Sequence, residues 1–376
     1  MGLFSKESKE KNFLGIDIGG SSVKLVELKA LQGRPLLVTY GYLERSTKST
    51  KESLLDRPDD MAQAIKRVAE KAKTHSKDAT TALPASAVFT TVLKLTDITE
   101  KDLSSIKKVT ASIEAEAKKV LPLPVEEMVL DWKVLKIPKK NVDGETVQKD
   151  RSVEVLLTAA SKEVVKKYIE IFKKAGLNLL SLETESFAMT RALLGKDSSP
   201  IIIVDMGAAN TDITLVDNGL PYFERTVDVG GYNITKNLSD TMGISLDQAE
   251  QFKRDLGSYK DKLPEGKLLP PSIEKVLAPV INEVKYIMQF FSQQPGNEDK
   301  KIDRIILSGG TARLFNAAEY FTQVFNIRAF PGDPWARLVY PEELKPVLDN
   351  IGSRLAVSIG LAMREIEKGT KLSDKK

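Results

Sequence analysis

The chain has 376 residues, and its 56 Lys and Arg nearly balance its 52 Asp and Glu, which leaves a net charge of +4. Such a balance does not indicate a nucleic-acid-binding protein. The chain has no cysteine, which excludes disulfides, zinc–thiolate sites and cysteine catalysis. It has only one histidine, His75, which disfavours a Ser/His/Asp triad. No apolar run reaches the ~20 residues that span a bilayer. We therefore expect a cytoplasmic globular protein of two or three domains.

The first predicted element is a strand pair over residues 13–28, FLGIDIGGSSVKLVEL, in which Asp17 ends an apolar run before a glycine turn. Glycines allow the backbone to approach a phosphate, and serines add hydroxyl donors. Lys24 either reaches the phosphates or points to solvent, and the pattern alone leaves both open. The candidate phosphate-binding residues of this hairpin are Gly19, Gly20, Ser21, Ser22 and Lys24.

A strand over 34–45 and a helix over 59–73 complete the start of one α/β lobe. The block at 83–157 differs: a strand at 86–95, a charged helix at 102–120, and two more strands at 129–137 and 152–160 predict an inserted subdomain. Leu121-Pro-Leu-Pro124 ends the helix, because proline lacks the donor and restricts the preceding residue. A polar loop at 138–151 separates the last two strands. The lobe resumes with a helix at 162–175, ended by Gly176.

The first hairpin pattern recurs at residues 200–217, PIIIVDMGAANTDITLVD, where Asp205 and Gly207 repeat the Asp-x-Gly. Asn210 and Thr211 are candidate phosphate ligands, although Ala208 and Ala209 replace the glycines of the tightest cradle. Asp212 is expected to be a charge on the strand surface. One Asp in each half predicts two related lobes that face a Mg²⁺–nucleotide, with Asp17 and Asp205 holding the metal through water.

A strand at 220–227, a helix-rich segment at 240–299, a strand and glycine turn at 304–314, and a closing helix at 351–365 follow. Ser245 and Gln248 form a capping box at the start of a helix. The charged residues Glu250, Lys253 and Arg254 lie on one face of that helix. Taken separately, these charges indicate a solvated ion pair; taken together with the glycine turns, they predict an adenosine site. Its candidate residues are Gly230, Gly231, Glu250, Lys253, Arg254, Gly309, Gly310 and Thr311.

Five segments in this order resemble the motifs of the actin-like ATPase superfamily, to which FtsA, actin and the heat-shock chaperones belong. They are the two hairpins, the connecting motif LETESFAMTRAL, the glycine turn IILSGGTARL, and the helix RLAVSIGLAMR. The resemblance implies an α/β, two-lobed actin-like (ribonuclease H-like) ATPase fold with four subdomains, ATP or ADP, and Mg²⁺. Glu185 matches an acidic position of the connecting motif and is the candidate catalytic residue. A lone carboxylate and no nearby histidine predict slow hydrolysis at most.

Within this superfamily, KLVEL, TALPASAVFTTVLKL and IEAEAKKVLPLPVEEMVLDWKVL resemble the PilM family of type IV pilus assembly proteins. The resemblance implies an ATP-binding adaptor that holds the cytoplasmic N-terminal tail of the inner-membrane protein PilN. The tail is expected in a groove where the inserted subdomain meets the first lobe. Membrane association is then indirect, at the inner face, with onward links to other pilus inner-membrane and motor components.

The resemblance also implies boundaries for the four subdomains. The expected parts are a tail at 1–12, a first lobe at 13–82 and 158–198, an FtsA-like inserted subdomain at 83–157, a second lobe at 199–239 and 300–366, a helical subdomain at 240–299, and a tail at 367–376.

Several alternatives stay open at this stage. GIDIGGSSVK also suits ROK-type sugar kinases, but these carry a zinc motif that a chain without cysteine lacks. An FtsA-like filament protein ends in an amphipathic helix, whereas EKGTKLSDKK has no apolar face. A secretion-system relative of the PilM family and a chain that has lost nucleotide binding fit the motifs as well.

Overall fold

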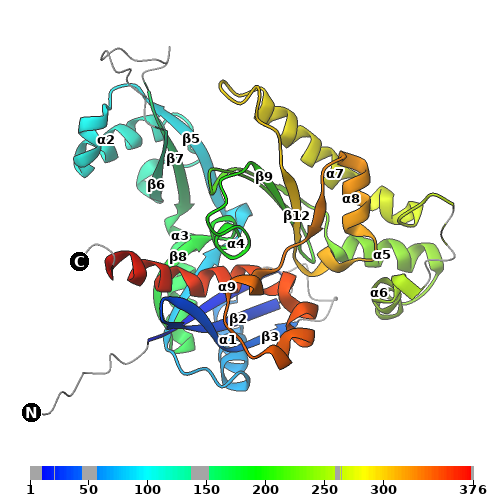
Figure 1. Cartoon of the computed structure of the whole chain (residues 1–376). Coiled ribbons are helices and arrows are strands. Elements are labelled where there is room, and N and C mark those ends of the chain that lie inside the picture. Colours follow the sequence, from blue (N-terminus) through cyan, green and yellow to red (C-terminus); the bar gives the residue numbers. More distant parts are fainter. Residues whose placement is uncertain are drawn as a thin grey trace, which may run out of the picture. The chain divides into compact units, whose positions relative to one another are not determined.

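The computed structural model describes residues 11–20, 22–44, 57–136, 152–258, 263 and 265–373. The chain forms two compact units, Met1–Leu83 with Glu170–Lys376 (the main unit) and Pro84–Ile169 (the inserted unit) (Figure 1). Ser21, the loop predicted at 138–151 and most of the tail predicted at 1–12 lie outside the described residues.

The first sheet of the main unit has the order β3-β2-β1-β4-β8. Its N-terminal strands are antiparallel, β4 and β8 run parallel to β1, and Asp17 lies opposite Lys24. Helix α1 (Pro58–Lys71) covers one face because its buried side chains recur at helical spacing. The strands are β1 (Asn12–Gly19), β2 (Ser22–Leu31), β3 (Arg34–Glu44), β4 (Asp78–Leu83) and β8 (Asn178–Thr184).

The second sheet repeats this topology, with the order β11-β10-β9-β12-β13. Its antiparallel hairpins place Asp205 opposite Asp212, and β12 runs parallel to β9. The two related lobes predicted from the repeated hairpins are therefore confirmed. The strands are β9 (Ile201–Met206), β10 (Thr211–Asp217), β11 (Leu220–Val227), β12 (Arg304–Ser308) and β13 (Ala329–Pro331).

Helices pack around the two sheets of the main unit. The longest of the second lobe, α7, buries one apolar stripe that runs from Ile273 to Phe291. Besides α1, these helices are α4 (Glu185–Leu193), α5 (Gly231–Met242), α6 (Leu246–Arg254), α7 (Pro271–Ser292), α8 (Ala317–Phe325) and α9 (Lys345–Ser373).

The closing helix is longer than the sequence predicts. The pattern indicated a helix at 351–365 and a tail from 367, but α9 runs from Lys345 to Ser373. Its C-terminal extension, REIEKGTKLS, is rich in Glu, Lys and Arg, which are good helix formers, and one glycine is not enough to stop it. The predicted tail is therefore helical for most of its length.

Helix α9 packs directly on backbone. Figure 1 shows it beside β2, and it also contacts β1 and α4. A Cβ on Gly15 of β1 would lie 1.9 Å from the Ser358 carbonyl oxygen, and one on Gly360 would lie 1.9 Å from that of Ala188. Glycine at these two positions therefore allows the helix to approach the strand and α4 more closely than any side chain permits.

The inserted unit is a three-stranded antiparallel sheet of order β5-β7-β6 with α2 packed on one face. The predicted helix at 102–120 is divided: a 3-10 turn at Glu100–Ser104 comes first and α2 covers only Ile106–Ala117. Helix α3 follows β7 without a break, so this unit reaches Ile169, whereas the predicted subdomain ends at 157. The elements are β5 (Val88–Leu95), β6 (Met128–Lys136), β7 (Val153–Ser161) and α3 (Lys162–Ala175).

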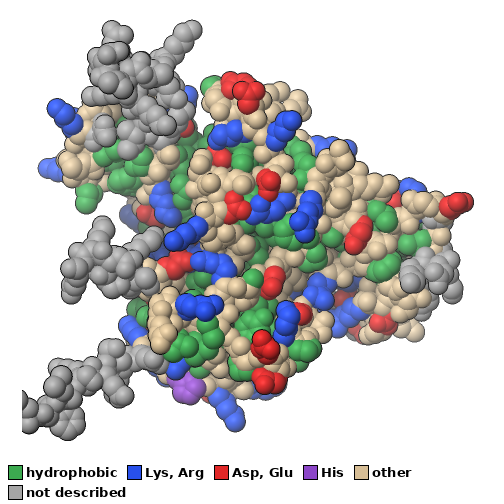
Figure 2. Space-filling model, viewed as in Figure 1, with side chains coloured by type: hydrophobic (Ala, Val, Ile, Leu, Met, Phe, Trp, Pro, Cys, Tyr) green, Lys and Arg blue, Asp and Glu red, His purple; other side chains and the backbone are tan. Residues whose placement is uncertain are grey.

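A fully buried carboxylate anchors the segment that joins α1 to β4. Glu27 of β2 accepts hydrogen bonds from the backbone N–H of His75 and of Ser76 and from the Asn12 side chain, at 2.8–3.1 Å. The His75 ring itself is 70% exposed and is the purple side chain in Figure 2. Glu27 therefore replaces the water that these donors lose on burial.

We predict that Glu27→Ala lowers the free energy of unfolding by about 2–4 kcal/mol, because the buried donors lose their acceptor. Urea unfolding of the full chain measures the loss. Glu70→Ala, which removes an exposed carboxylate from α1, is the matched control and should change stability by less than about 0.5 kcal/mol. Equal stability of the Glu27 variant and the control would contradict the anchoring role.

Candidate functional site

In the first hairpin, the turn length determines what Asp17 faces. Directly opposite residues of an antiparallel pair project to the same face, so Asp17 and Lys24 meet, with Lys24 Nζ 2.8 Å from Asp17 Oδ2. Burial alone lowers the pKa of Lys24, but the Asp17 charge and hydrogen bond, with Asp205 and Glu185, raise it above its ordinary value. Lys24 thus points into the protein, and the solvent-facing alternative is wrong.

The second hairpin places an acid where the first has a lysine. Asp212 lies opposite Asp205, is buried, and accepts a hydrogen bond from Thr226 Oγ1 at 2.5 Å. The expectation that Asp212 is a surface charge is therefore wrong, since the pairing that follows from the 207–210 turn turns both aspartates to one face. Burial raises the pKa of Asp212 above its ordinary range.

These groups belong to a carboxylate cluster of Asp17, Glu185, Asp205, Asp212 and Glu224. Glu185 is the first residue of α4, and burial together with the charges of the other four raises its pKa well above 4.5. Burial raises the pKa of Asp205 to about 7, against the opposing effect of Lys24. Burial and the Asp212 charge likewise raise the pKa of Glu224 to about 7, although Ser186 donates to its Oε2 at 3.2 Å.

The glycine segments of the second lobe meet at one place. Gly231 N–H donates to the Gly207 carbonyl at 2.9 Å, and Thr311 Oγ1 donates to the same oxygen at 3.5 Å. A Cβ on Gly230 would lie 2.6 Å from Ala208, and one on Gly309 would lie 2.4 Å from the Met206 carbonyl. These glycines therefore allow α5 and the turn after β12 to close on the 207–210 turn.

The first-lobe turn is different, because a Cβ on Gly20 would meet nothing within 4 Å and one on Gly19 would make only ordinary contacts. Gly20 thus leaves open space beside the backbone, whereas Gly19 lies in ordinary contact with Ser22 and Lys24. Asn210 closes the other turn, where its carbonyl accepts from Gly207 N–H at 3.0 Å, and Thr211 Oγ1 donates to Val229 at 2.6 Å.

The predicted charged face of α6 is mostly enclosed. Lys253, 13% exposed, donates to Glu250 Oε2 at 2.7 Å and to the Gly231 carbonyl at 3.1 Å. Thr235 also donates to Glu250, whereas Arg254 at 3.3 Å is half in solvent. The fully solvated ion pair considered from the sequence is therefore wrong for Lys253, which is joined to the glycine segments.

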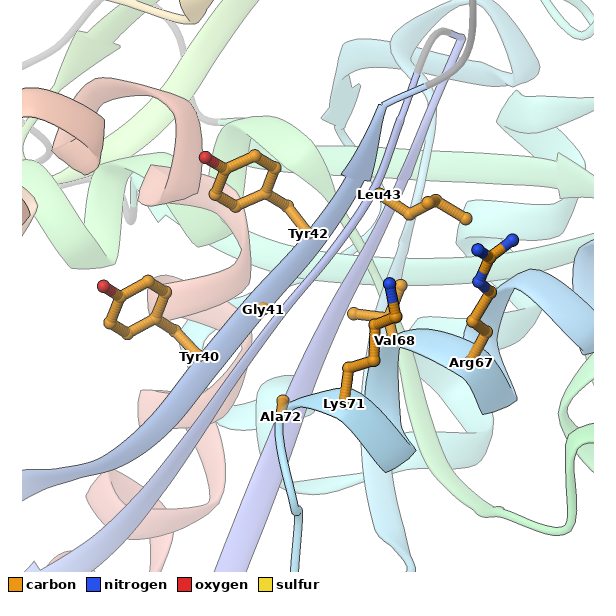
Figure 3. A pocket seen from close by; sticks show the side chains of 8 residues that line it. All are labelled: Tyr40, Gly41, Tyr42, Leu43, Arg67, Val68, Lys71 and Ala72. Atoms are coloured by element: carbon orange, nitrogen blue, oxygen red, sulfur yellow. The ribbon is translucent and has the colours of Figure 1, made fainter.

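One cavity of the main unit lies elsewhere, between the end of β3 and α1 (Figure 3). Tyr40 and Tyr42 project from β3, while Arg67 and Lys71 project from α1. None of its lining residues belongs to the predicted site. On the face in Figure 2, acidic and basic side chains are interspersed, as the balanced composition predicts.

The family described as "Type IV pilus assembly protein PilM" matches residues 15–366. The chain belongs to the PilM family. Its curated relatives include the cell division protein FtsA of Streptococcus pneumoniae, 23% identical over 85% of this chain and 75% of the relative. FtsA of Bacillus subtilis is 28% identical, but that alignment covers only 42% of this chain and 38% of the relative.

Solved structures agree with the PilM assignment. A "PilM-PilN type IV pilus biogenesis complex" has a TM-score of 0.76 and 25% identity, and covers 94% of this chain and 98% of that one. The ethanolamine utilization protein EutJ of Carboxydothermus hydrogenoformans shares the fold, with a TM-score of 0.54 and 16% identity. The match covers 94% of this chain and 89% of EutJ. None of the helices in the described ranges combines the length and hydropathy needed to cross a membrane.

The PilM-family chain offers oxygen donors that fit a hydrated Mg²⁺. Within the described part of the chain, no three acidic or histidine side chains are arranged to hold a metal directly. Contact through water does not need such a trio, and partly buried Asp205, whose pKa is raised to about 7 by desolvation, would gain from a nearby cation. Asp17 and Asp205 as indirect ligands therefore stay a prediction.

Two site residues of this PilM-family protein were missed from the sequence. They are Asp212, whose pattern predicts a surface charge although register alone places it beside Asp205, and Glu224. Glu224 lies opposite Thr214, a fully buried residue, so strand pairing of β10 with β11 was the available signal. Its approach to Glu185 depends on α4, which pairing does not reveal.

We predict that Glu224→Gln stabilises the ligand-free protein at pH 8 and leaves its stability nearly unchanged near pH 4. The folded pKa of about 7 exceeds the ordinary 4.5, so the native state binds more protons between these values and wild-type stability falls as pH rises through that window. At about 1.4 kcal/mol per pH unit, the gain is at most about 3 kcal/mol. Urea unfolding at both pH values measures it.

Glu283→Gln, on α7, is the matched control, because this carboxylate pairs with exposed Arg225 at 2.9 Å. It should not stabilise the protein at either pH. A Glu224 variant that is less stable than wild type at pH 8 would contradict the buried, uncompensated state of this carboxylate.

Proposed function

We propose that the chain is an ATP- or ADP-binding adaptor of type IV pilus assembly that captures an extended tail of a PilN-like membrane protein. The observation that carries the proposal is the family match over residues 15–366, together with the similarity to a solved PilM–PilN complex over nearly the whole chain. A metabolic kinase is a weaker candidate, because the family match describes pilus assembly.

Nucleotide binding is supported by the convergence of the predicted residues. In this proposal, the open space beside Gly20, the acidic cluster with Lys24, and the joined segments around Gly207 are complementary parts of one site in the main unit. Backbone N–H groups and Lys24 suit phosphate oxygens, and hard carboxylate oxygens suit Mg²⁺. Magnesium bound there would offset part of the negative charge of the phosphates and of the carboxylate cluster.

In this proposal the nucleotide mainly stabilises the two-lobed structure, by binding only the folded state. Glu185 is the best-placed group to orient an attacking water. Burial and the charges of the neighbouring carboxylates raise its pKa. A single carboxylate without a histidine nearby suits slow hydrolysis at most.

We predict that Asp205→Asn weakens Mg–ATP binding by at least about tenfold, because an anionic ligand of the hydrated metal is lost. Asp17→Asn should act similarly. At pH 8 the ligand-free thermal midpoint of Asp205→Asn should not fall, since burial opposes its charge. Isothermal titration and thermal unfolding measure the two effects.

Asp247→Asn, which removes an exposed carboxylate from the first turn of α6, is the control of equal charge. It should bind Mg–ATP as wild type does. Unchanged affinity for both site variants would reject the metal role of these aspartates, and no ATP or ADP binding by wild type would reject a nucleotide-binding adaptor.

Tail capture is supported by a surface of the inserted unit. The turn after α2 is held by Leu121 and Val125, which pack on the core, while Val120, Leu123 and Val129 are each 42–44% exposed. Val129 lies in β6, an edge strand, and edge strands offer main-chain donors and acceptors to an extended peptide. Two backbone donors of β6 are already used, because the Trp132 N–H is bonded to the Asp131 carboxylate and the Met128 N–H to the Val125 carbonyl.

We predict that Leu123→Asp weakens binding of a PilN N-terminal tail peptide by at least about tenfold, because an apolar contact at the turn becomes charged. Fluorescence polarisation with the full chain and nucleotide measures the affinity. Ile106→Asp, at an exposed apolar residue of α2 in the same unit, should change it by less than about twofold. Equal binding by both variants would place the tail elsewhere, and no binding by wild type would overturn the adaptor proposal.

A further inference from the structure

An ion pair joins the end of β3 to helix α9 in the main unit. Arg354 Nη1 donates to Glu44 Oε1 at 2.5 Å, across 310 positions of the sequence. Their side chains are 31% and 47% exposed, so water and solutes reach both partners. Exposed pairs of this kind are weak and easily exchanged.

Arg354 also lies against the glycine turn of the candidate nucleotide site. Its Nε lies 3.7 Å from where a Cβ on Gly310 would be. The preceding residue, Ser353, accepts a hydrogen bond from Gly309 N–H at 2.9 Å, which holds this part of α9 to the turn. The guanidinium therefore sits beside predicted ligand-binding backbone while its charge is paired with a residue of the other lobe.

The positive charge around this turn extends beyond Arg354. Burial lowers the pKa of Lys253, and the charges of Arg254 and Arg354 lower it further, so these cations act on one another. Glu250 compensates Lys253, and Glu44 compensates Arg354. If Glu44 moves away, the turn is left with a planar cation that has no partner and can bind a phosphate by two parallel hydrogen bonds.

We propose that Arg354 is a phosphate-binding residue for the bound nucleotide and that Glu44 occupies it as an internal competitor when no nucleotide is present. The inference rests on the proposed nucleotide binding. Binding then exchanges Glu44 for a phosphate oxygen, so affinity depends on a contact between β3 of the first lobe and α9. The ligand class is a nucleoside di- or triphosphate, and adenosine alone has no group to displace the carboxylate.

The test measures ADP and adenosine binding to the full chain by isothermal titration. Glu44→Gln should tighten ADP binding by about threefold, because the competitor loses its charge. Arg354→Met should weaken it by about tenfold, and Arg354→Lys should restore part of the loss because it keeps the charge without the fork. In the Arg354→Met background, Glu44→Gln should have no further effect on ADP binding, and adenosine affinity should be the same for all variants.

Asp349→Asn is the matched control, since it removes a similarly exposed carboxylate of α9 that pairs with Lys345 at 3.2 Å. It should leave ADP affinity unchanged. The competitor role is overturned if wild type binds ADP but Glu44→Gln does not bind it more tightly. It is also overturned if Asp349→Asn raises ADP affinity as much as Glu44→Gln does. Equal effects on adenosine overturn the phosphate assignment. A wild type that binds no ADP overturns the proposed nucleotide function and this inference with it, whereas the tail-capture test stands apart.

Discussion

The close packing of α9 against backbone is the constraint on which the main unit depends. A Cβ on Gly15 of β1 would lie 1.9 Å from the Ser358 carbonyl oxygen of α9, and a Cβ on Gly360 of α9 would lie 1.9 Å from the Ala188 carbonyl oxygen of α4. Arg191 of α4 reinforces the contact by donating to the Gly360 carbonyl at 2.7 Å and to Glu183, a nearly buried carboxylate. A larger residue at either glycine would separate the elements that carry Asp17 and Glu185, because interiors are close-packed and cannot absorb a methyl group.

The same packing concentrates negative charge. β1, α4 and the second hairpin each contribute to the carboxylate cluster, while Lys24 supplies a compensating cation. Groups such as Asp205 and Glu224, whose pKa values rise to about 7, make the ligand-free state less stable than an apolar version would be. Under the proposed function, a site for a cation and phosphates carries this cost in stability in its ligand-free state, which is a common balance between stability and function.

The inserted unit is built on different principles. Its core comes from one face of a small sheet and one helix, and apolar residues such as Leu123 and Val129 stay exposed beside an edge strand. The main unit, in contrast, buries two sheets with helices around them. A unit with its own core can present a binding surface without disturbing the packing of α9, so tail capture and nucleotide binding occupy separate parts of the chain in the proposed function.

Much of the fold follows from the sequence, because strand pairing and helix periodicity are local. The Asp-x-Gly hairpins, the helix that begins at Lys162 and the end of α2 before Leu-Pro-Leu-Pro were all predictable, and the short turns determine that Asp17 faces Lys24 and Asp205 faces Asp212. The buried position of Asp212 was predictable too, because the length of the 207–210 turn determines the strand register that pairs it with Asp205.

The rest was decided only by tertiary structure. The approach of Glu224 to Glu185, the burial of Lys253 beside Gly231, and the pairing of Arg354 with Glu44 join elements that are far apart in the chain. The distances between these side chains depend on how whole sheets and helices pack. Neither the hydrophobic periodicity of a segment nor the sequence of a turn determines them. The pKa values follow the same division, since the sequence determines which groups titrate and burial determines how far each one shifts.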